Sequence, residues 1–239
     1  MESNSNKETN LQKIREATEL LLLVPFSVIE DIPFFVSHPI FDITTVYLKH
    51  CGDKRYYNLL DADDYHIIVN DYKERIMNAS VLGCYMMIRT PYKLTWLKYC
   101  EEYLSEKDLA KYLAYSWVEE ENPNQDVNCP ISYLVKLFKK CNKQYLMTEE
   151  DYKIYQNLSD EITVYRGVAV NRNPNGLSWT KNLKTAQWFA NRFNTETKKG
   201  YVQTAIVSKS KVLAYFNTRN EDEIVCKVPK KDIHILKGE

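Results

Sequence analysis

The sequence predicts an α+β protein with a helical N-terminal lobe followed by a small, mainly antiparallel β-sheet core. Helical spacing of apolar residues dominates positions 11–160. After Asp160, segments rich in β-branched and aromatic residues take over, with one helical pattern among them. The 239 residues, 44% hydrophobic and 27% charged, suffice to bury a core without disulfides or metals. We expect a disordered tail over 1–10, the helical lobe over 11–160 and the β-rich core over 161–239, together forming one compact domain.

The first helix is expected to begin at Leu11 and to end before Pro25. Residues 26–59 contain two prolines and a glycine, which indicates loop with short elements. Asp61 is a candidate N-cap for a longer helix that runs to about Ile88.

Capping residues and the spacing of apolar residues also predict the other helices of the lobe. Residues 121–130 are rich in Asn and Pro and are expected to form a loop. Four further helices are predicted: through residues 94–103, after the capping pair Ser105 and Asp108, from Ile131 to Phe138, and after the capping pair Thr148 and Asp151.

The last third of the chain alternates short strands with turns. One helix is expected from about Asn182, where five apolar residues recur at helical spacing. The strands are predicted over residues 162–168, 177–180, 201–207, 212–216, 223–228 and 233–236.

Composition excludes several classes of protein. Lys plus Arg and Asp plus Glu number 32 each, so net charge predicts no dominant attraction to nucleic acid or to a membrane, although a local basic face is compatible with it. The six cysteines include no Cys-x-x-Cys pair, and none of the four histidines lies at metal-ligand spacing from them. Residues 1–10 lack the pattern of a secretion signal, and the longest apolar run, 20–24, is too short to cross a bilayer. We expect a cytoplasmic protein with free thiols.

Arg166 interrupts an otherwise apolar strand and is followed by Gly167. A buried guanidinium needs a partner, and two interpretations are even: a phosphate bound by both arms of the planar fork, or a structural ion pair with a glutamate. The glycine is expected to let a ligand approach the backbone.

Two pairs of polar residues lie at strand spacing. Side chains two apart point to one face, so Ser178 and Thr180 present two hydroxyls together, and Glu221 and Glu223 present two carboxylates while Asp222 points away. Paired carboxylates suit acid–base or electrostatic work on a sugar centre. Taken singly, each pair also fits ordinary edge-strand residues or a solvated acidic turn.

The order Arg166, Ser178-Trp179-Thr180, Glu221-Asp222-Glu223 resembles the arginine–serine–glutamate type of mono-ADP-ribosyltransferase, as in bacterial or phage toxins and effectors. The resemblance covers residues 164–228 and implies a split β-sheet core of ADP-ribosyltransferase type that binds NAD as co-substrate, with no metal. Many family members have Ser-x-Ser where this chain has Ser178-Trp179-Thr180, so the bulky Trp179 is expected to change the packing behind the strand.

The resemblance also implies how NAD is held. Arg166, beside Gly167, would bind the pyrophosphate. Phe189 and Arg192, on the helix after the hydroxyl strand, match family positions at which an aromatic stacks on nicotinamide and an arginine reaches the phosphates. Thr180 keeps a hydroxyl where the family has its second serine.

The same resemblance implies the catalytic roles. Ser178 would hold Glu223, which would accept a hydrogen bond from the 2′-hydroxyl of the nicotinamide ribose and stabilise the positive charge that develops as nicotinamide leaves. Glu221 would orient or deprotonate the acceptor. In the family a glutamate at that position goes with arginine acceptors, so a protein arginine is the expected target.

Other functions stay open at this point. The acceptor is alternatively a base of RNA or DNA, or water, which would make the protein an NAD glycohydrolase. A catalytically silent module that binds NAD or a partner would release no nicotinamide, and a purely structural interpretation makes the ordered set of polar residues a coincidence. The resemblance further implies a toxin or effector that acts inside a cell and is restrained by an antitoxin or immunity protein.

Overall fold

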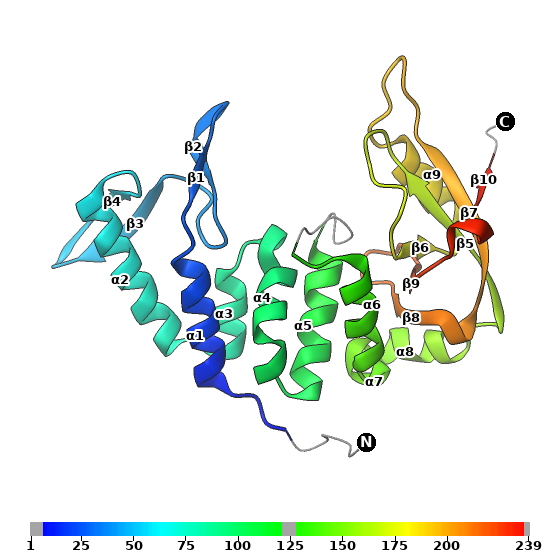
Figure 1. Ribbon diagram of the computed structural model, residues 1–239, viewed down its shortest axis with the longest axis horizontal. Coiled ribbons are helices and arrows are strands. Elements are labelled where there is room, and N and C mark those ends of the chain that lie inside the picture. Colours follow the sequence, from blue (N-terminus) through cyan, green and yellow to red (C-terminus); the bar gives the residue numbers. More distant parts are fainter. Residues whose placement is uncertain (1–6, 121–127, 237–239) are drawn as a thin grey trace. The chain divides into compact units, whose positions relative to one another are not determined.

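The computed structural model describes residues 7–120 and 128–236 (Figure 1). The chain divides into two compact units, Met1–Ser105 and Glu106–Glu239. The predicted α+β class is confirmed: a helical N-terminal region precedes a six-stranded antiparallel sheet. The change from helix to strand at residue 160 lies inside the second unit, so the helices that immediately precede the sheet belong to the same compact unit as the sheet.

The first unit combines helices with two antiparallel β-hairpins. Its elements are α1 (Leu11–Leu22), β1 (Ser27–Ile29), β2 (Ile32–Ser37), β3 (Thr45–His50), β4 (Asp53–Asn58), α2 (Ala62–Asn78), α3 (Val81–Met87), the 3-10 turn η1 (Thr90–Tyr92), α4 (Lys93–Cys100) and the 3-10 turn η2 (Glu101–Tyr103). The short elements expected between residues 26 and 59 are these hairpins.

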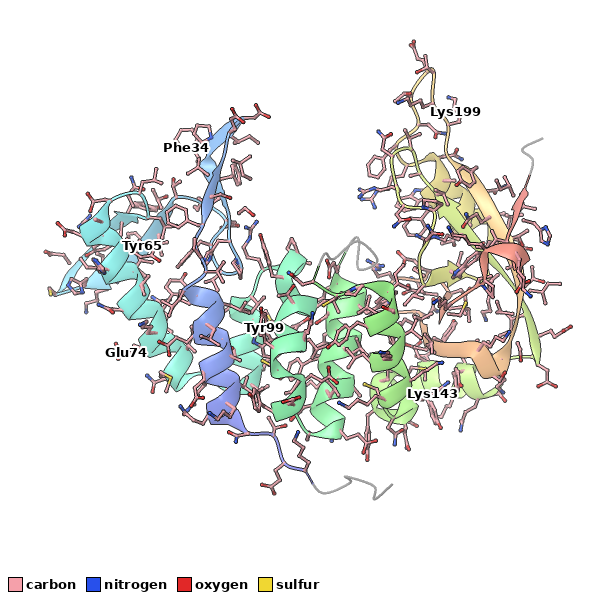
Figure 2. All side chains as sticks on the ribbon, in the orientation of Figure 1. Phe34, Tyr65, Glu74, Tyr99, Lys143 and Lys199 are labelled. Carbon is pink, nitrogen blue, oxygen red and sulfur yellow. The ribbon has the colours of Figure 1, made fainter. Side chains whose placement is uncertain are left out.

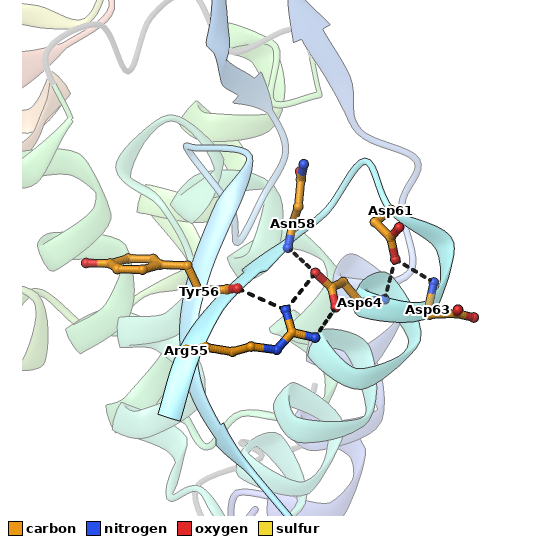
Figure 3. A network of polar contacts seen from close by, with 6 residues as sticks. All are labelled: Arg55, Tyr56, Asn58, Asp61, Asp63 and Asp64. Atoms are coloured by element: carbon orange, nitrogen blue, oxygen red, sulfur yellow. Dashed lines mark hydrogen bonds and ion pairs between the residues drawn. The ribbon is translucent and has the colours of Figure 1, made fainter. Parts of the chain in front are cut away.

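The hairpins have different relations to the helices. The β1–β2 hairpin presents apolar side chains to solvent, and Phe34 is 72% exposed (Figure 2). The β3–β4 hairpin is tied to α2 through Asp64, which accepts hydrogen bonds from the Arg55 guanidinium at 2.7 Å and from the backbone N–H of Asn58 at 2.9 Å (Figure 3). These charged and backbone contacts fix the hairpin to the start of the helix.

Capping residues locate the helix ends. The Asp61 carboxylate accepts from the backbone N–H groups of Asp63 and Asp64, which confirms it as the N-cap of α2. The prediction of one helix to Ile88 is wrong: α2 ends at Asn78, and Ser80 caps α3 by accepting from a backbone N–H. A serine hydroxyl competes for backbone donors and so favours a new helix start.

Of the predicted N-terminal tail, residues 7–10 are described. Asn10 is the N-cap of α1, and its backbone N–H donates to the carbonyl of Tyr103 at 2.8 Å. The other residues of the tail, and residues 121–127 of the predicted loop, lie outside the described part of the chain.

The second unit places helices before the sheet and one helix within it. Its elements are α5 (Glu106–Glu119), α6 (Ile131–Lys140), α7 (Lys143–Leu146), α8 (Glu149–Gln156), β5 (Glu161–Val168), β6 (Ser178–Thr180), α9 (Leu183–Asn191), β7 (Tyr201–Ser208), the 3-10 turn η4 (Lys209–Lys211), β8 (Val212–Phe216), β9 (Glu223–Cys226), the 3-10 turn η5 (Lys230–Asp232) and β10 (His234–Leu236). Each predicted strand after residue 160 has its counterpart within two residues at either end.

The sheet has the order β10-β7-β5-β6-β9-β8, and every neighbouring pair is antiparallel. β5 pairs with β7 over eight residues, from Glu161 to Val168. On its other side β5 meets β6 at one pair of residues, Tyr165 and Thr180. The six strands thus form two sets of three, joined at a single pair.

Helices contact both sets of strands, with α6, α7 and α8 against β8 and α9 against β5, β6 and β7. Trp117 of α5 packs edge-on against Phe138 of α6, with ring centroids 5.1 Å apart, and both side chains are buried. On β5 and β7, α9 packs through Ala186 and Ala190, which are fully buried beside Val202. Small residues let the helix lie close to the strands.

All six cysteines are free thiols, five of them buried. Over residues 7–120 and 128–236, no helix combines the length and apolar character needed to cross a bilayer.

A candidate active-site cleft where the sheet divides

A cleft opens in the second unit at the place where β5 and β6 separate. With the open solvent at its mouth, the cleft has a volume of about 950 Å³. It brings together all eight residues that the sequence singled out: Arg166, Gly167, Ser178, Thr180, Phe189, Arg192, Glu221 and Glu223. The cleft thus gathers side chains from β5, β6, α9, β9 and the turn before β9.

Arg166 spans the division of the sheet. Its Nη1 donates to the carbonyl oxygen of Ser178 at 2.6 Å, and Nη2 donates to that of Asn173 at 3.4 Å. The Nε group is buried and has no hydrogen-bond partner among the described residues. Burial lowers the pKa of this guanidinium to about 10, and the carboxylate of Glu223 acts in the opposite sense. Arg166 therefore replaces the missing strand pairing and keeps one donor for an anion.

Glu223 is the buried carboxylate of the cleft, 6% exposed. The indole Nε1 of Trp117 donates to its Oε1 at 3.0 Å, and the Ser178 side chain also hydrogen-bonds to it. Burial raises the pKa of the Glu223 carboxyl above its ordinary value, whereas these two hydrogen bonds lower it. The predicted pairing of Ser178 with Glu223 is present, because the two residues lie diagonally across the β6–β9 ladder.

Glu221 reaches the cleft by a different route from the predicted one. β9 begins at Glu223, so Glu221 lies in the preceding turn, and strand alternation does not place the two carboxylates together. Asn220 and Asp222 have φ values of 56° and 49°, a left-handed conformation that Asn and Asp adopt more readily than most residues. Glu221 accepts from Nη2 of Arg219 at 3.0 Å. The prediction that Glu221 and Glu223 share one face of a strand is therefore wrong, although both carboxylates line the cleft.

The Thr180 hydroxyl is occupied by backbone groups. It donates to the carbonyl oxygen of Glu221 at 2.6 Å and accepts from the N–H of Asn182 at 2.9 Å. Asn182 in turn caps α9. Thr180 therefore holds the turn that carries Glu221 and the start of α9.

Gly167 is required for packing within the sheet and helix. A Cβ atom at this position would overlap the carbonyl oxygen of Ala186 and lie 2.6 Å from the backbone nitrogen of Ala190. The glycine therefore permits α9 to lie against β5. We expected it to admit a ligand, but the space that its missing side chain leaves is filled by the helix.

Phe189 and Arg192 stand on the α9 side of the cleft. Phe189 is half-buried and contacts the exposed Trp188 edge-on, with centroids 4.9 Å apart. The Arg192 guanidinium lies 5.5 Å from the centre of the Trp188 ring and 5.3 Å from that of Phe193. This wall therefore presents aromatic surface and positive charge together.

Several cleft residues gave no signal in the sequence. Trp117 comes from α5 and Glu120 directly follows that helix, whereas Arg172, Phe193 and Arg219 lie in loops or turns. A contact between residues 106 positions apart, such as that of Trp117 with Glu223, leaves no trace in local spacing. Only the aromatic pattern of the helix after Asn182 could have pointed to Phe193.

Among the described residues, no group of three or more His, Cys, Asp or Glu side chains is placed to hold a metal ion. The chemistry that this set can perform is electrostatic: a fixed, buried carboxylate facing arginine and aromatic surface.

No family model, no curated protein and no solved structure matches the chain in a comparison with each. The geometry of the cleft and the order of its residues in the sequence are therefore the grounds for assigning a function.

Proposed function

We propose that the protein is an NAD-dependent mono-ADP-ribosyltransferase that releases nicotinamide from NAD and transfers ADP-ribose to a macromolecular acceptor. One observation carries the proposal. Glu223 is buried in the cleft, held by Trp117 and Ser178, and shares the cleft with Arg166, whose Nε group has no partner in the described chain. A buried carboxylate that is fixed by two donors is suited to stabilise a developing positive charge.

The divided sheet supports the same proposal. The resemblance implies a split β-sheet core, and here two sets of three strands meet at the single pair Tyr165 and Thr180. The side chain of Arg166 crosses the division. We assign the core to the ADP-ribosyltransferase type on these grounds.

A dinucleotide fits the residues of the cleft. The buried, unpartnered Nε of Arg166 offers a donor to an anion such as a pyrophosphate. Arg192 adds a second cation, and Phe189 offers a face to a cationic pyridinium ring.

The reaction would follow from these positions. The bond between the nicotinamide nitrogen and C1′ of the ribose breaks, and its electron pair leaves with nicotinamide. Positive charge then develops at C1′. The buried carboxylate of Glu223 stabilises this charge more strongly than a carboxylate in bulk water would. The acceptor supplies the electron pair for the new bond to C1′ and releases a proton, which Glu221, also in the cleft, accepts.

The test is nicotinamide release from NAD by the full chain, measured by chromatography, together with transfer of label from adenylate-labelled NAD to a cell lysate. Glu223→Gln should abolish both, because it removes the charge and keeps the shape. Glu196→Gln, which changes an exposed glutamate of the same unit, is the matched control and should leave both intact. Absence of nicotinamide release from the unmodified chain would refute the enzyme and favour a silent binding module.

The resemblance extends the proposal to a toxin or effector that acts inside a cell and is restrained by an antitoxin or immunity protein. Expression of the chain in a bacterial host should then arrest growth, and expression of Glu223→Gln should not. Equal growth of the two cultures would count against the toxin role while leaving the enzymatic proposal to the assay of nicotinamide release.

A further inference from the structure

The charges of the chain are divided between its two parts. The total is 32 basic and 32 acidic side chains. Residues 161–239 hold fourteen Lys and Arg against seven Asp and Glu, whereas residues 1–160 hold eighteen against twenty-five. The sheet region therefore carries a net charge of +7 and the preceding region −7. Such a division indicates that the sheet region attracts an anionic partner, which the overall neutrality conceals.

Aromatic rings and arginines alternate along one wall of the cleft and continue onto its outer surface. The Arg172 guanidinium lies 5.1 Å from the centre of the Phe193 ring, and Arg192 lies between the rings of Phe193 and Trp188. We call Arg172, Phe193, Arg192 and Trp188 the arginine–aromatic row. The first three line the cleft, and Trp188 lies outside its lining, so the row leads from the cleft to the surface of α9.

The rings of the row are open to solvent. Trp188 is 58% exposed and Phe193 is 42% exposed. Lys198 and Lys199 lie in the loop between α9 and β7, and Figure 2 shows Lys199 near the tip of that loop. Exposed aromatic faces beside arginines and lysines suit a ligand that has flat rings and repeated negative charges.

The same charges disfavour the acceptor that Glu221 predicted. The carboxylate of Glu221 already accepts from Arg219, so an incoming guanidinium would have to displace this side chain. Arg172 and Arg192, which also line the cleft, would repel it. A polyanion is instead attracted by the arginines Arg172, Arg192 and Arg219.

We propose that the acceptor is a single-stranded nucleic acid, whose bases stack on Trp188 and Phe193 and whose phosphates pair with Arg172, while Arg192 serves the pyrophosphate of NAD. The strand must be single because only unpaired bases expose their faces for stacking. This inference rests on the proposed transferase activity and names its substrate class. A base nitrogen would form the new bond to C1′ as nicotinamide leaves with its electron pair, and the proton of that nitrogen would pass to Oε1 of Glu221, because Arg219 donates to the other carboxylate oxygen.

Binding without NAD tests the row by itself. Fluorescence anisotropy of the full chain with a labelled single-stranded RNA, a single-stranded DNA and a duplex of the same sequence should show tighter binding of at least one single strand. Loss of one stacked base is worth about 1–3 kcal/mol, so Trp188→Ala should weaken binding roughly 5- to 150-fold, and Trp188→Phe should retain most of it. Phe34→Ala, which removes an exposed aromatic ring from the first unit, is the control and should bind as the unmodified chain does.

Salt dependence tests the arginines. Each phosphate contact contributes about 0.7 to the slope of log affinity against log salt for single strands, so Arg172→Gln should reduce the slope by about that amount. Equal binding of the duplex and the single strands, or equal affinity of Trp188→Ala and the unmodified chain, would overturn the proposal.

Transfer of label separates this inference from the proposed function. Adenylate-labelled ADP-ribose should become attached to a single-stranded oligonucleotide and be removed by nuclease treatment. Label that appears in a lysate only on protease-sensitive material would overturn the nucleic-acid acceptor and leave the transferase intact. Failure to release nicotinamide under any condition would instead refute the transferase itself.

Discussion

The indole Nε1 of Trp117 donates a hydrogen bond of 3.0 Å to Oε1 of Glu223. Trp117 is 1% exposed and Glu223 is 6% exposed, so both groups lie almost entirely out of water. A hydrogen bond to a charged group contributes about 1.5–3 kcal/mol. Through this bond α5 becomes part of the site, although the predicted site residues all lie after residue 160.

Trp117→Phe should reduce catalysis without loss of the fold, because the phenyl ring keeps the contact with Phe138 and loses the donor. The rate of nicotinamide release should fall about tenfold or more, which corresponds to 1.5–3 kcal/mol, with little change in the KM for NAD. The remaining bond from Ser178 leaves the Glu223 carboxylate less stabilised, so its pKa should rise. The acidic limb of the pH–rate profile should therefore move to higher pH.

Phe138→Leu is the matched control, since Phe138 contacts the same indole at 5.1 Å between centroids and has no polar atom in its side chain. It should lower the melting temperature and leave the pH profile in place. Trp117 positions Glu223 if only Trp117→Phe moves the acidic limb. Coincident limbs for Trp117→Phe and the unmodified chain would make it a packing residue.

Glu223→Gln should stabilise the fold at neutral pH. Burial raises the pKa of Glu223 in the folded chain above the unfolded value of about 4.3. The folded state therefore holds the proton more tightly, and stability is lost as the pH rises from that value through the folded pKa. Glutamine keeps the acceptor for Trp117 without this loss. We expect a melting temperature higher by about 2–4 °C for each kcal/mol gained at pH 7–8, and no gain below about pH 4.

Circular dichroism at several pH values measures this difference. Glu221→Gln serves for comparison, since its side chain is 23% exposed and paired with Arg219. Loss of this partly exposed ion pair should lower the melting temperature only slightly. A Glu223→Gln gain that persists unchanged at acidic pH would show that titration of this carboxyl is not its cause.

The local sequence pattern was sufficient to predict much of the secondary structure of the second unit. β-branched runs predicted the strands, and Asn182 was recognised as the start of α9, because each depends on residues near in sequence. The break between α2 and α3 was missed because Ser80 competes for backbone donors inside an otherwise continuous apolar stripe. In the first unit, the hairpins emerged only as unspecified short elements, since most of their side chains are exposed and lack an alternating pattern.

Arg166 shows where sequence reasoning about the site reached its limit. A phosphate and a structural partner were equally good explanations of an arginine in an apolar strand. The structure gives it structural partners, the carbonyls of Ser178 and Asn173, and leaves Nε for another group. The division of the sheet that creates this arrangement depends on pairing between strands, which no local pattern encodes.

Gly167→Ala and Gly176→Ala should separate stability from function. A Cβ atom at Gly167 would overlap the backbone of α9, which cannot move without leaving β5. We expect the free energy of unfolding to fall by about 1–3 kcal/mol, visible as a lower melting temperature.

A Cβ atom at Gly176 would lie 2.5 Å from Nη2 of Arg166, the end of a flexible side chain. This variant should keep its melting temperature and show a higher KM for NAD.

Comparable melting temperatures for Gly167→Ala and the unmodified chain would mean that α9 can shift on β5. An unchanged KM in Gly176→Ala would remove Arg166 from the binding of NAD. Each result bears on one residue, because the two glycines touch different elements.

Arg219→Ala should improve the use of a small guanidine as acceptor. Arg219 donates to Glu221 at 3.0 Å and thus occupies the carboxylate that a guanidine acceptor needs. An exposed ion pair contributes about 0–1 kcal/mol, so its removal should raise the rate of transfer to agmatine by up to about fivefold. Nicotinamide release without acceptor should change less, since Arg219 acts on Glu223 only through its charge among the effects on that carboxyl. Arg192→Ala provides the comparison, because it removes a positive charge from the cleft and leaves the Arg219–Glu221 pair intact. If only Arg219→Ala increases the rate of transfer to agmatine, Glu221 selects the acceptor and Arg219 prevents guanidines from binding to it. Equal rates with agmatine in all three proteins would mean that Glu221 takes no part in acceptor choice.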